Sequence, residues 1–263
     1  MRHGLLSLSS ALLITVTLYS GFIRSAAADE VALPYATVKY SGTKAILHAN
    51  SRRDLASMVY TLWQEFHIPL TFEDAPVMFA ADFDDITVPD YRSRFPGDRL
   101  LVPRGGVLDI QFTVPAVGQP PPDTPSILDA LLNAHSRAGY PGEYGLRRED
   151  EIWHIIPLRT RDQQGRPVQV TPLMDTPVRI TREEGRTNAG VISTICELIY
   201  RSTGRRLFLG THLSSSYLEG TADQDFNGTA REWLESTFVK SRGHALWILN
   251  CTPLNGPCAL NIY

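Results

Sequence analysis

The sequence has little positive charge, few cysteines and, after its first 28 residues, no long apolar run. It carries 25 lysines and arginines against 28 aspartates and glutamates in 263 residues. Proteins that bind nucleic acids usually show a basic excess, so we expect no nucleic-acid partner. A transmembrane helix needs roughly 18 or more consecutive apolar residues, so we expect no membrane span once the amino-terminal segment is removed.

Short motifs that mark common kinds of enzyme are also missing. The sequence contains no P-loop, no dinucleotide-binding glycine fingerprint, no Gly-x-Ser-x-Gly nucleophile elbow and no His-Glu-x-x-His metal motif. Each of these patterns places particular groups around a phosphate, an acyl group or a metal ion. The seven histidines are scattered, whereas zinc ligands usually lie close together in sequence. We therefore predict no catalytic residue, no cofactor and no metal ligand.

The amino terminus has the three parts of a secretory signal peptide. A short basic start is followed by an apolar stretch over 5–19, and small residues over 25–28 precede Asp29. Cleavage is expected after Ala28, which places the mature protein in the periplasm or outside the cell. A retained membrane anchor is the alternative, because residues 4–23 are just long enough to cross a hydrocarbon layer of roughly 30 Å.

The three cysteines divide into a close pair and a single residue. Cys251 and Cys258 are separated by a turn-rich stretch that includes Asn255-Gly256, a pair favoured in hairpin loops. Strand-like apolar runs flank them, and exported proteins meet oxidising conditions. We therefore predict a disulfide between Cys251 and Cys258 across a carboxy-terminal hairpin. Cys196 lies between isoleucines on the apolar face of a predicted helix, and we interpret it as a small buried apolar residue.

The apolar spacing predicts the same order of elements twice: helix, strand, strand, helix and hairpin. Polar caps begin the helices, most clearly in the capping box from Thr229 to Glu232 and also at Ser51. Gly139 and Gly243 are predicted to end the second helix of each series. In the first series the predicted ranges are 51–66, 68–72, 107–114, 124–138 and 144–157. In the second they are 188–202, 206–209, 217–219, 229–239 and the hairpin that contains the cysteine pair.

These two series define the predicted domains. We expect an α+β protein of two related domains that arose by internal duplication, each a small sheet with two helices on one face and a carboxy-terminal hairpin. A polar stretch with glycine and proline is typical of a linker between them. The predicted boundaries are 1–28 for the signal peptide, 29–158 for the first repeat with an insertion at about 73–106, 159–167 for the linker and 168–263 for the second repeat.

The second series resembles the short N-terminal domain of secretins and TonB-dependent receptors. Residues 201–209, which run through Ser-Thr-Gly, match the end of the family's first helix and the strand that follows it. Residues 228–234 match the Thr-capped start of its second helix. The first series fits less closely, with His67 where the family usually has glycine. The resemblance implies periplasmic modules that bind other proteins and carry out no catalysis, and any partner channel is expected to be a separate chain.

We therefore expect a non-enzymatic exported protein that binds an envelope or secreted protein, with strand addition at a sheet edge as its mode. The oligomeric state stays open. One alternative is small-molecule binding between the repeats. Another is a secreted hydrolase that uses acidic residues of the insertion with His135 or His154. We interpret the carboxylates of this region as a solvated loop rather than a calcium site; they are Glu73, Asp74, Asp82, Asp84, Asp85 and Asp90.

Overall fold

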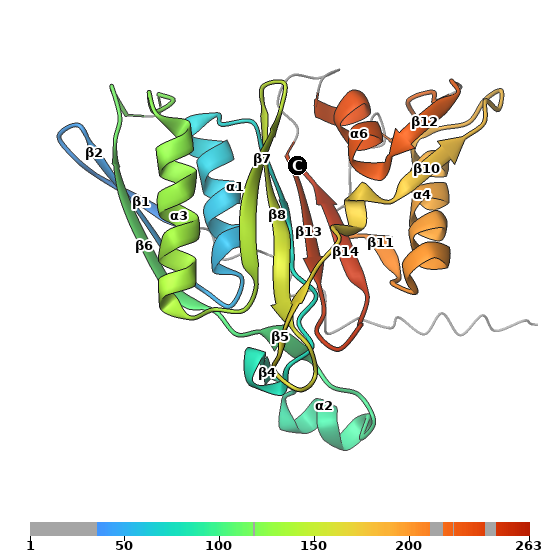
Figure 1. Ribbon diagram of the computed structural model, residues 1–263, viewed down its shortest axis with the longest axis horizontal. Coiled ribbons are helices and arrows are strands. Elements are labelled where there is room, and N and C mark those ends of the chain that lie inside the picture. The colour runs from blue at the N-terminus through green and yellow to red at the C-terminus, as the bar shows by residue number, and fades with distance from the viewer. Residues whose placement is uncertain (1–35, 118, 211–217, 223, 240–245) are drawn as a thin grey trace, which may run out of the picture. The chain divides into compact units, whose positions relative to one another are not determined.

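The computed structural model describes residues 36–263 except 118, 211–217, 223 and 240–245. The predicted signal peptide, its cleavage after Ala28 and the helix end at Gly243 therefore lie outside the described residues. The described residues all belong to one compact unit, in which helices and strands are mixed (Figure 1). This confirms the α+β class. Among the described residues, no helix combines the length and the apolar character needed to span a membrane.

Helices and strands follow the apolar periodicity of the sequence. The strands are β1 (Thr37–Ser41), β2 (Lys44–Ser51), β3 (Leu70–Glu73), β4 (Phe83–Asp85), β5 (Leu101–Pro103), β6 (Gly106–Thr113), β7 (Glu143–Glu149), β8 (Ile152–Arg161), β9 (Pro167–Gln169), β10 (Pro177–Ile180), β11 (Leu207–Leu209), β12 (Phe226–Thr229), β13 (Trp247–Cys251) and β14 (Cys258–Ile262). The helices are α1 (Asp54–Phe66), α2 (Pro89–Arg94), α3 (Thr124–Ala138), α4 (Asn188–Thr203) and α6 (Ala230–Leu234). Shorter elements are the 3₁₀ turns η2 (Ala80–Asp82) and η3 (Leu173–Asp175) and the π-helix η4 (Glu235–Val239).

Two of the predicted helix caps are present in the structure and one is not. The predicted capping box is present, because the Thr229 hydroxyl accepts a hydrogen bond from the Glu232 amide and the Glu232 carboxylate accepts one from the Thr229 amide. Gly139 ends α3 in a left-handed conformation, as predicted. The predicted cap at Ser51 is wrong. Ser51 still belongs to β2, its hydroxyl accepts from the Arg53 amide, and Arg53 precedes the helix.

Two predicted elements of the second series also differ. Leu218 is helical and Glu219 lies in a bend, so no strand forms at these two residues of the predicted range 217–219. A strand forms further along the chain instead, at β12, and it pairs antiparallel with β10. The predicted helix over 229–239 consists of α6 and then the π-helix η4.

One sheet contains strands from both predicted repeats. Its order is β11-β14-β13-β3-β8-β7, and β9 pairs with the end of β8. The central pair joins β3 of the first series to β13 of the second in parallel, with Ile248 beside Phe72 and Leu249 beside Glu73. Where the sequence predicts a separate sheet for each repeat, hydrogen bonds between these two strands make the sheet continuous.

The segment predicted as a linker, 159–167, is a hairpin of this sheet. β8 continues to Arg161, and β9 returns beside it with Arg159 opposite Gln169. The Asp162 carboxylate holds the turn by accepting hydrogen bonds from two backbone amides. The polar composition of the stretch therefore reflects a tight turn rather than a connection between separate bodies.

The shared sheet has an apolar core on each face. Successive side chains of a strand point to opposite faces. In β13, Ile248 packs into the core that contains α1 and α3, whereas Trp247 and Leu249 pack into the core that contains α4 and α6. Figure 1 shows α1 and α3 beside β7 and β8, and α4 beside β11.

Each half of the chain uses the same pattern of strand pairing. In the first half, β2 pairs with β6 antiparallel, β3 runs parallel to β8, and β8 runs antiparallel to β7. In the second half, β10 pairs with β12 antiparallel, β11 runs parallel to β14, and β14 runs antiparallel to β13. Each half therefore contributes three neighbouring strands, in the same arrangement, to the shared sheet.

Candidate functional site

An open groove of about 540 Å³ lies between α4 and β11, the last strand at one end of the shared sheet. Ile192 and Cys196 from α4 and Leu207 from β11 give it an apolar floor. The two α4 residues lie on one face because they are four positions apart. The hydroxyl of Thr187 caps the helix at its start, and the left-handed Gly204 ends it and leads the chain into β11.

Two aromatic side chains stand on the rim of this groove. Tyr200 is 41% exposed and Phe208 is 49% exposed. The guanidinium of Arg206 lies 5.7 Å from the centre of the Tyr200 ring. Among the described residues Arg206 forms no ion pair, whereas Arg201 pairs with Glu197. The rim therefore offers two aromatic surfaces and one positive charge to a ligand.

The outer side of β11 carries backbone groups that point away from the sheet. On the inner side, Arg206 and Gly210 both form backbone hydrogen bonds with β14. Alternate residues of a strand in a parallel pair turn their N–H and C=O groups to opposite sides. The N–H and C=O groups of Leu207 and Leu209 therefore point outward, and in the described part of the chain no strand pairs with that side of β11.

Cys196 is half-buried in the floor of the groove and packs against the second apolar core. Burial raises the pKa of its thiol to about 11. The thiolate is the reactive form of cysteine, so this thiol is a poor nucleophile at neutral pH. The position agrees with the interpretation of Cys196 as an apolar packing residue.

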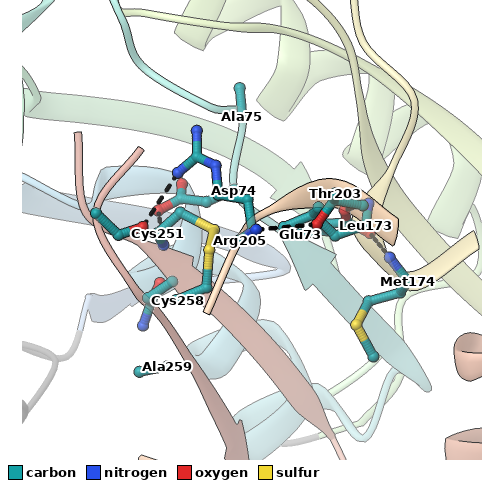
Figure 2. Close-up of a disulfide and its surroundings, with 12 residues drawn as sticks. Glu73, Asp74, Ala75, Leu173, Met174, Thr203, Arg205, Cys251, Cys258 and Ala259 are labelled. Carbon is teal, nitrogen blue, oxygen red and sulfur yellow. Dashed lines mark hydrogen bonds between the residues drawn. A yellow bond between two sulfur atoms is a disulfide. The ribbon is translucent and has the colours of Figure 1, made fainter. Parts of the chain in front are cut away.

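The predicted disulfide between Cys251 and Cys258 is confirmed (Figure 2). The two residues lie opposite each other in the β13–β14 hairpin, and their sulfur atoms are 2.09 Å apart. The Asp74 carboxylate accepts hydrogen bonds from the Cys251 amide and from the Arg53 side chain. Burial raises the pKa of Asp74, and Arg53 opposes that rise. These contacts tie the disulfide-bonded end of the hairpin to the segment after β3.

A second open cavity, of about 520 Å³, borders the disulfide. Thr160 and Gln169 line it from the β8–β9 hairpin, Thr203 and Arg205 line it from the end of α4, and Glu73 lies in its inner wall. Residues of both halves thus form its walls. A small molecule that binds between the two predicted repeats, which is one of the alternatives given above, would lie in this cavity.

A group of charged side chains, buried at its centre and half-exposed at Arg147 and Glu149, lies between the sheet and α6. Arg231, 1% exposed, lies at its centre and donates hydrogen bonds of 2.9 Å to both Glu73 and Asp175. Arg147 donates two more to Asp175, at 2.6 and 2.9 Å. We call this group the buried polar cluster; its members are Thr71, Glu73, Arg147, Glu149, His154, Asp175, Arg231 and Glu235.

Burial controls the protonation of the cluster. It raises the pKa of Glu73 to about 7, although Arg231 and two backbone amides of η3 favour the ionised form. Burial and the nearby guanidinium groups lower the pKa of His154 to about 3, so this imidazole is neutral at neutral pH. For Asp175, burial is outweighed by hydrogen bonds from its arginine partners, which lower its pKa.

The ring of His154 lies between two polar groups. Its Nδ1 lies 2.7 Å from Thr71 Oγ1, and its Nε2 lies 3.3 Å from Glu235 Oε1. Glu149 completes a group in which one possible ligand atom from each residue lies within 4.8 Å of the others. Imidazole and carboxylate are metal ligands, so His154, Glu149 and Glu235 are the described residues placed to hold a metal ion. Spacing along the sequence does not predict this group, because Glu235 is far from the other two residues along the chain.

The acidic residues at and near the insertion are largely paired. Asp82 is 2% exposed and pairs with Arg161. Glu73 and Asp74 are also buried. The interpretation as a solvated loop is therefore wrong for these three carboxylates, because strands and arginines of other segments cover them. Two further aspartates of the insertion that pair with arginines are Asp84 and Asp85.

His135 forms a separate buried pair with Asp54. Its Nδ1 lies 3.0 Å from the Asp54 carboxylate, and its Nε2 lies 3.2 Å from the Pro141 carbonyl oxygen. The pocket beside His135 and Asp54 measures about 20 Å³, against about 540 Å³ for the groove beside α4 and about 520 Å³ for the cavity beside the disulfide. This pair therefore has no room for a substrate.

No family model, curated protein or solved structure matches this chain.

Proposed function

We propose that this protein is exported and binds an extended segment of another envelope protein, which adds as a strand to β11 in the groove beside α4. The observation that carries the proposal is the combination of an outward-facing strand edge and an apolar groove at one place. In strand addition, backbone hydrogen bonds supply affinity and pockets for alternate side chains supply specificity.

The groove also indicates the chemistry of the added segment. Its apolar floor and the rings of Tyr200 and Phe208 favour apolar side chains at alternate positions. Arg206 favours a carboxylate beside Tyr200, where the guanidinium already lies over the ring. A segment of this kind would bury the exposed aromatic surface and satisfy the backbone groups of Leu207 and Leu209.

We further propose that the two halves are duplicates of one module similar to the short N-terminal domain of secretins and TonB-dependent receptors. The repeated pairing pattern supports this, because β2, β3, β6, β7 and β8 each have a counterpart with the same partner and direction. The strand of the first module that corresponds to β11 is β3. In the shared sheet, β13 pairs with β3 in parallel, on the side away from β8. The first module thus shows a neighbouring strand paired at the position that we propose for the partner.

Phage-displayed random peptides of about ten residues test this function. We expect selection on the purified protein to enrich peptides with apolar residues at alternate positions and an acidic residue near one end. Phe208→Asp should weaken their binding at least about tenfold, because it places a charge in the apolar contact. Val107→Asp is the matched control, since Val107 is 51% exposed on β6, away from the groove. Peptides that bind the Phe208→Asp variant as well as the wild type would contradict the proposal.

A further inference from the structure

We propose that Glu149, His154 and Glu235 form a binding site for a divalent transition-metal ion of the Zn²⁺ type, which fastens the β7–β8 hairpin to the start of η4. The site is distinct from the groove and does not depend on the proposed protein-binding function.

The side-chain atoms of the three residues lie close enough together to bind one ion. His154 is fully buried, and its Nε2 has no hydrogen-bond partner among the described residues although it lies 3.3 Å from Glu235 Oε1. A buried polar atom without a partner is unfavourable, and an ion between these atoms would satisfy it. Tetrahedral Zn²⁺ with bonds of about 2.0–2.1 Å would bring the ligand atoms to about 3.4 Å apart. The present separations of up to 4.8 Å need only modest closure.

The other ring nitrogen of His154 has the kind of partner that metal-binding histidines have. Metal-binding histidines almost always hydrogen-bond through their other ring nitrogen, which fixes the ring. Nδ1 of His154 has such a partner in Thr71 Oγ1, at 2.7 Å.

The position of the site indicates how an ion enters and what it does. The Glu149 side chain is 36% exposed, whereas His154 and Glu235 are buried, so the site opens to solvent on the Glu149 side. A water molecule there would be the fourth ligand. Glu235 is the first residue of a π-helix, an element often found at functional sites. The ion would link a hairpin of the first half to a helix of the second.

Titration of the EDTA-treated protein with ZnCl₂ by calorimetry tests this site. We expect one Zn²⁺ per chain, a rise of several degrees in Tm with added Zn²⁺, and no comparable response to Mg²⁺. Glu149→Gln should weaken Zn²⁺ binding at least about tenfold. Glu143→Gln is the matched control, because this glutamate lies on the same strand and is 55% exposed; its binding should equal that of the wild type.

A spectroscopic measurement on the unaltered protein makes the test independent of how the variants fold. Bound Co²⁺ should show the intense visible absorption of a four-coordinate site with nitrogen and oxygen ligands. Absence of stoichiometric Zn²⁺ binding by the folded wild type would overturn the proposal, as would a Glu149→Gln protein that binds Zn²⁺ as tightly as Glu143→Gln.

Discussion

Replacing Arg231 by methionine is expected to lower the free energy of unfolding by about 3–5 kcal/mol at pH 8. Arg231 is 1% exposed and is the only guanidinium that an ion pair joins to Glu73 among the described residues. Methionine keeps much of the side-chain volume but leaves the Glu73 carboxylate buried without a counter-charge. Removing one partner of a buried ion pair costs far more than removing an exposed pair. Urea denaturation followed by circular dichroism measures the difference.

Two further variants serve as controls for the Arg231→Met variant. Arg201→Met removes an arginine that is 72% exposed in a surface pair, and it should cost less than about 1 kcal/mol. The double variant Glu73→Gln with Arg231→Met should recover at least half of the lost stability, because glutamine is uncharged and can still accept from the η3 amides. A single variant as stable as Arg201→Met would show that the ion pair of Arg231 is not the contact that matters.

The stability of the protein relative to a Glu73→Gln variant is expected to fall as the pH rises. The carboxyl of Glu73 has a pKa near 4.5 when unfolded and about 7 when folded, because burial disfavours its charge. Between these values the folded state binds the proton more tightly, so Glu73 stabilises the fold at low pH. This contribution is full below about pH 4.5 and is lost as the pH passes through about 7.

The measurement is the free energy of unfolding of both proteins from about pH 4 to about pH 8, in EDTA. The wild-type value minus the Glu73→Gln value should become more negative by about 3 kcal/mol over this range. The charged groups that act on Glu73 are Arg231 and Asp175, and both proteins contain them, so their effects largely cancel in the difference. A difference that stays constant with pH, or that grows in favour of the wild type, would contradict the raised pKa.

Local patterns in the sequence predict most of the elements but not how the halves combine. The helix spacings, the Thr229 capping box and the Cys251–Cys258 pair depend on neighbouring residues, and the structure contains all of them. The pairing of β3 with β13 joins residues more than 170 positions apart, and no short-range pattern specifies it. Each half contains enough predicted strands for a sheet, so each half taken alone predicts a sheet of its own.

The buried polar cluster also depends on contacts between the two halves, which short-range patterns do not specify. In β3, Leu70 and Phe72 alternate with Thr71 and Glu73, and such alternation predicts one buried and one solvated face. In the structure all four residues are buried, because α6 of the second half brings Arg231 onto the polar face. The alternation correctly separates the two faces, but it does not show what covers the polar one.

Hydrogen exchange at two backbone amides tests the proposed strand addition most directly. A selected peptide should slow the exchange of the Leu207 and Leu209 amides at least about tenfold, because it takes up the outward side of β11 in hydrogen bonds. The Phe208 amide, which faces β14, should change little. A peptide that binds tightly while the Leu207 and Leu209 amides exchange at their free rates would contradict strand addition at this edge.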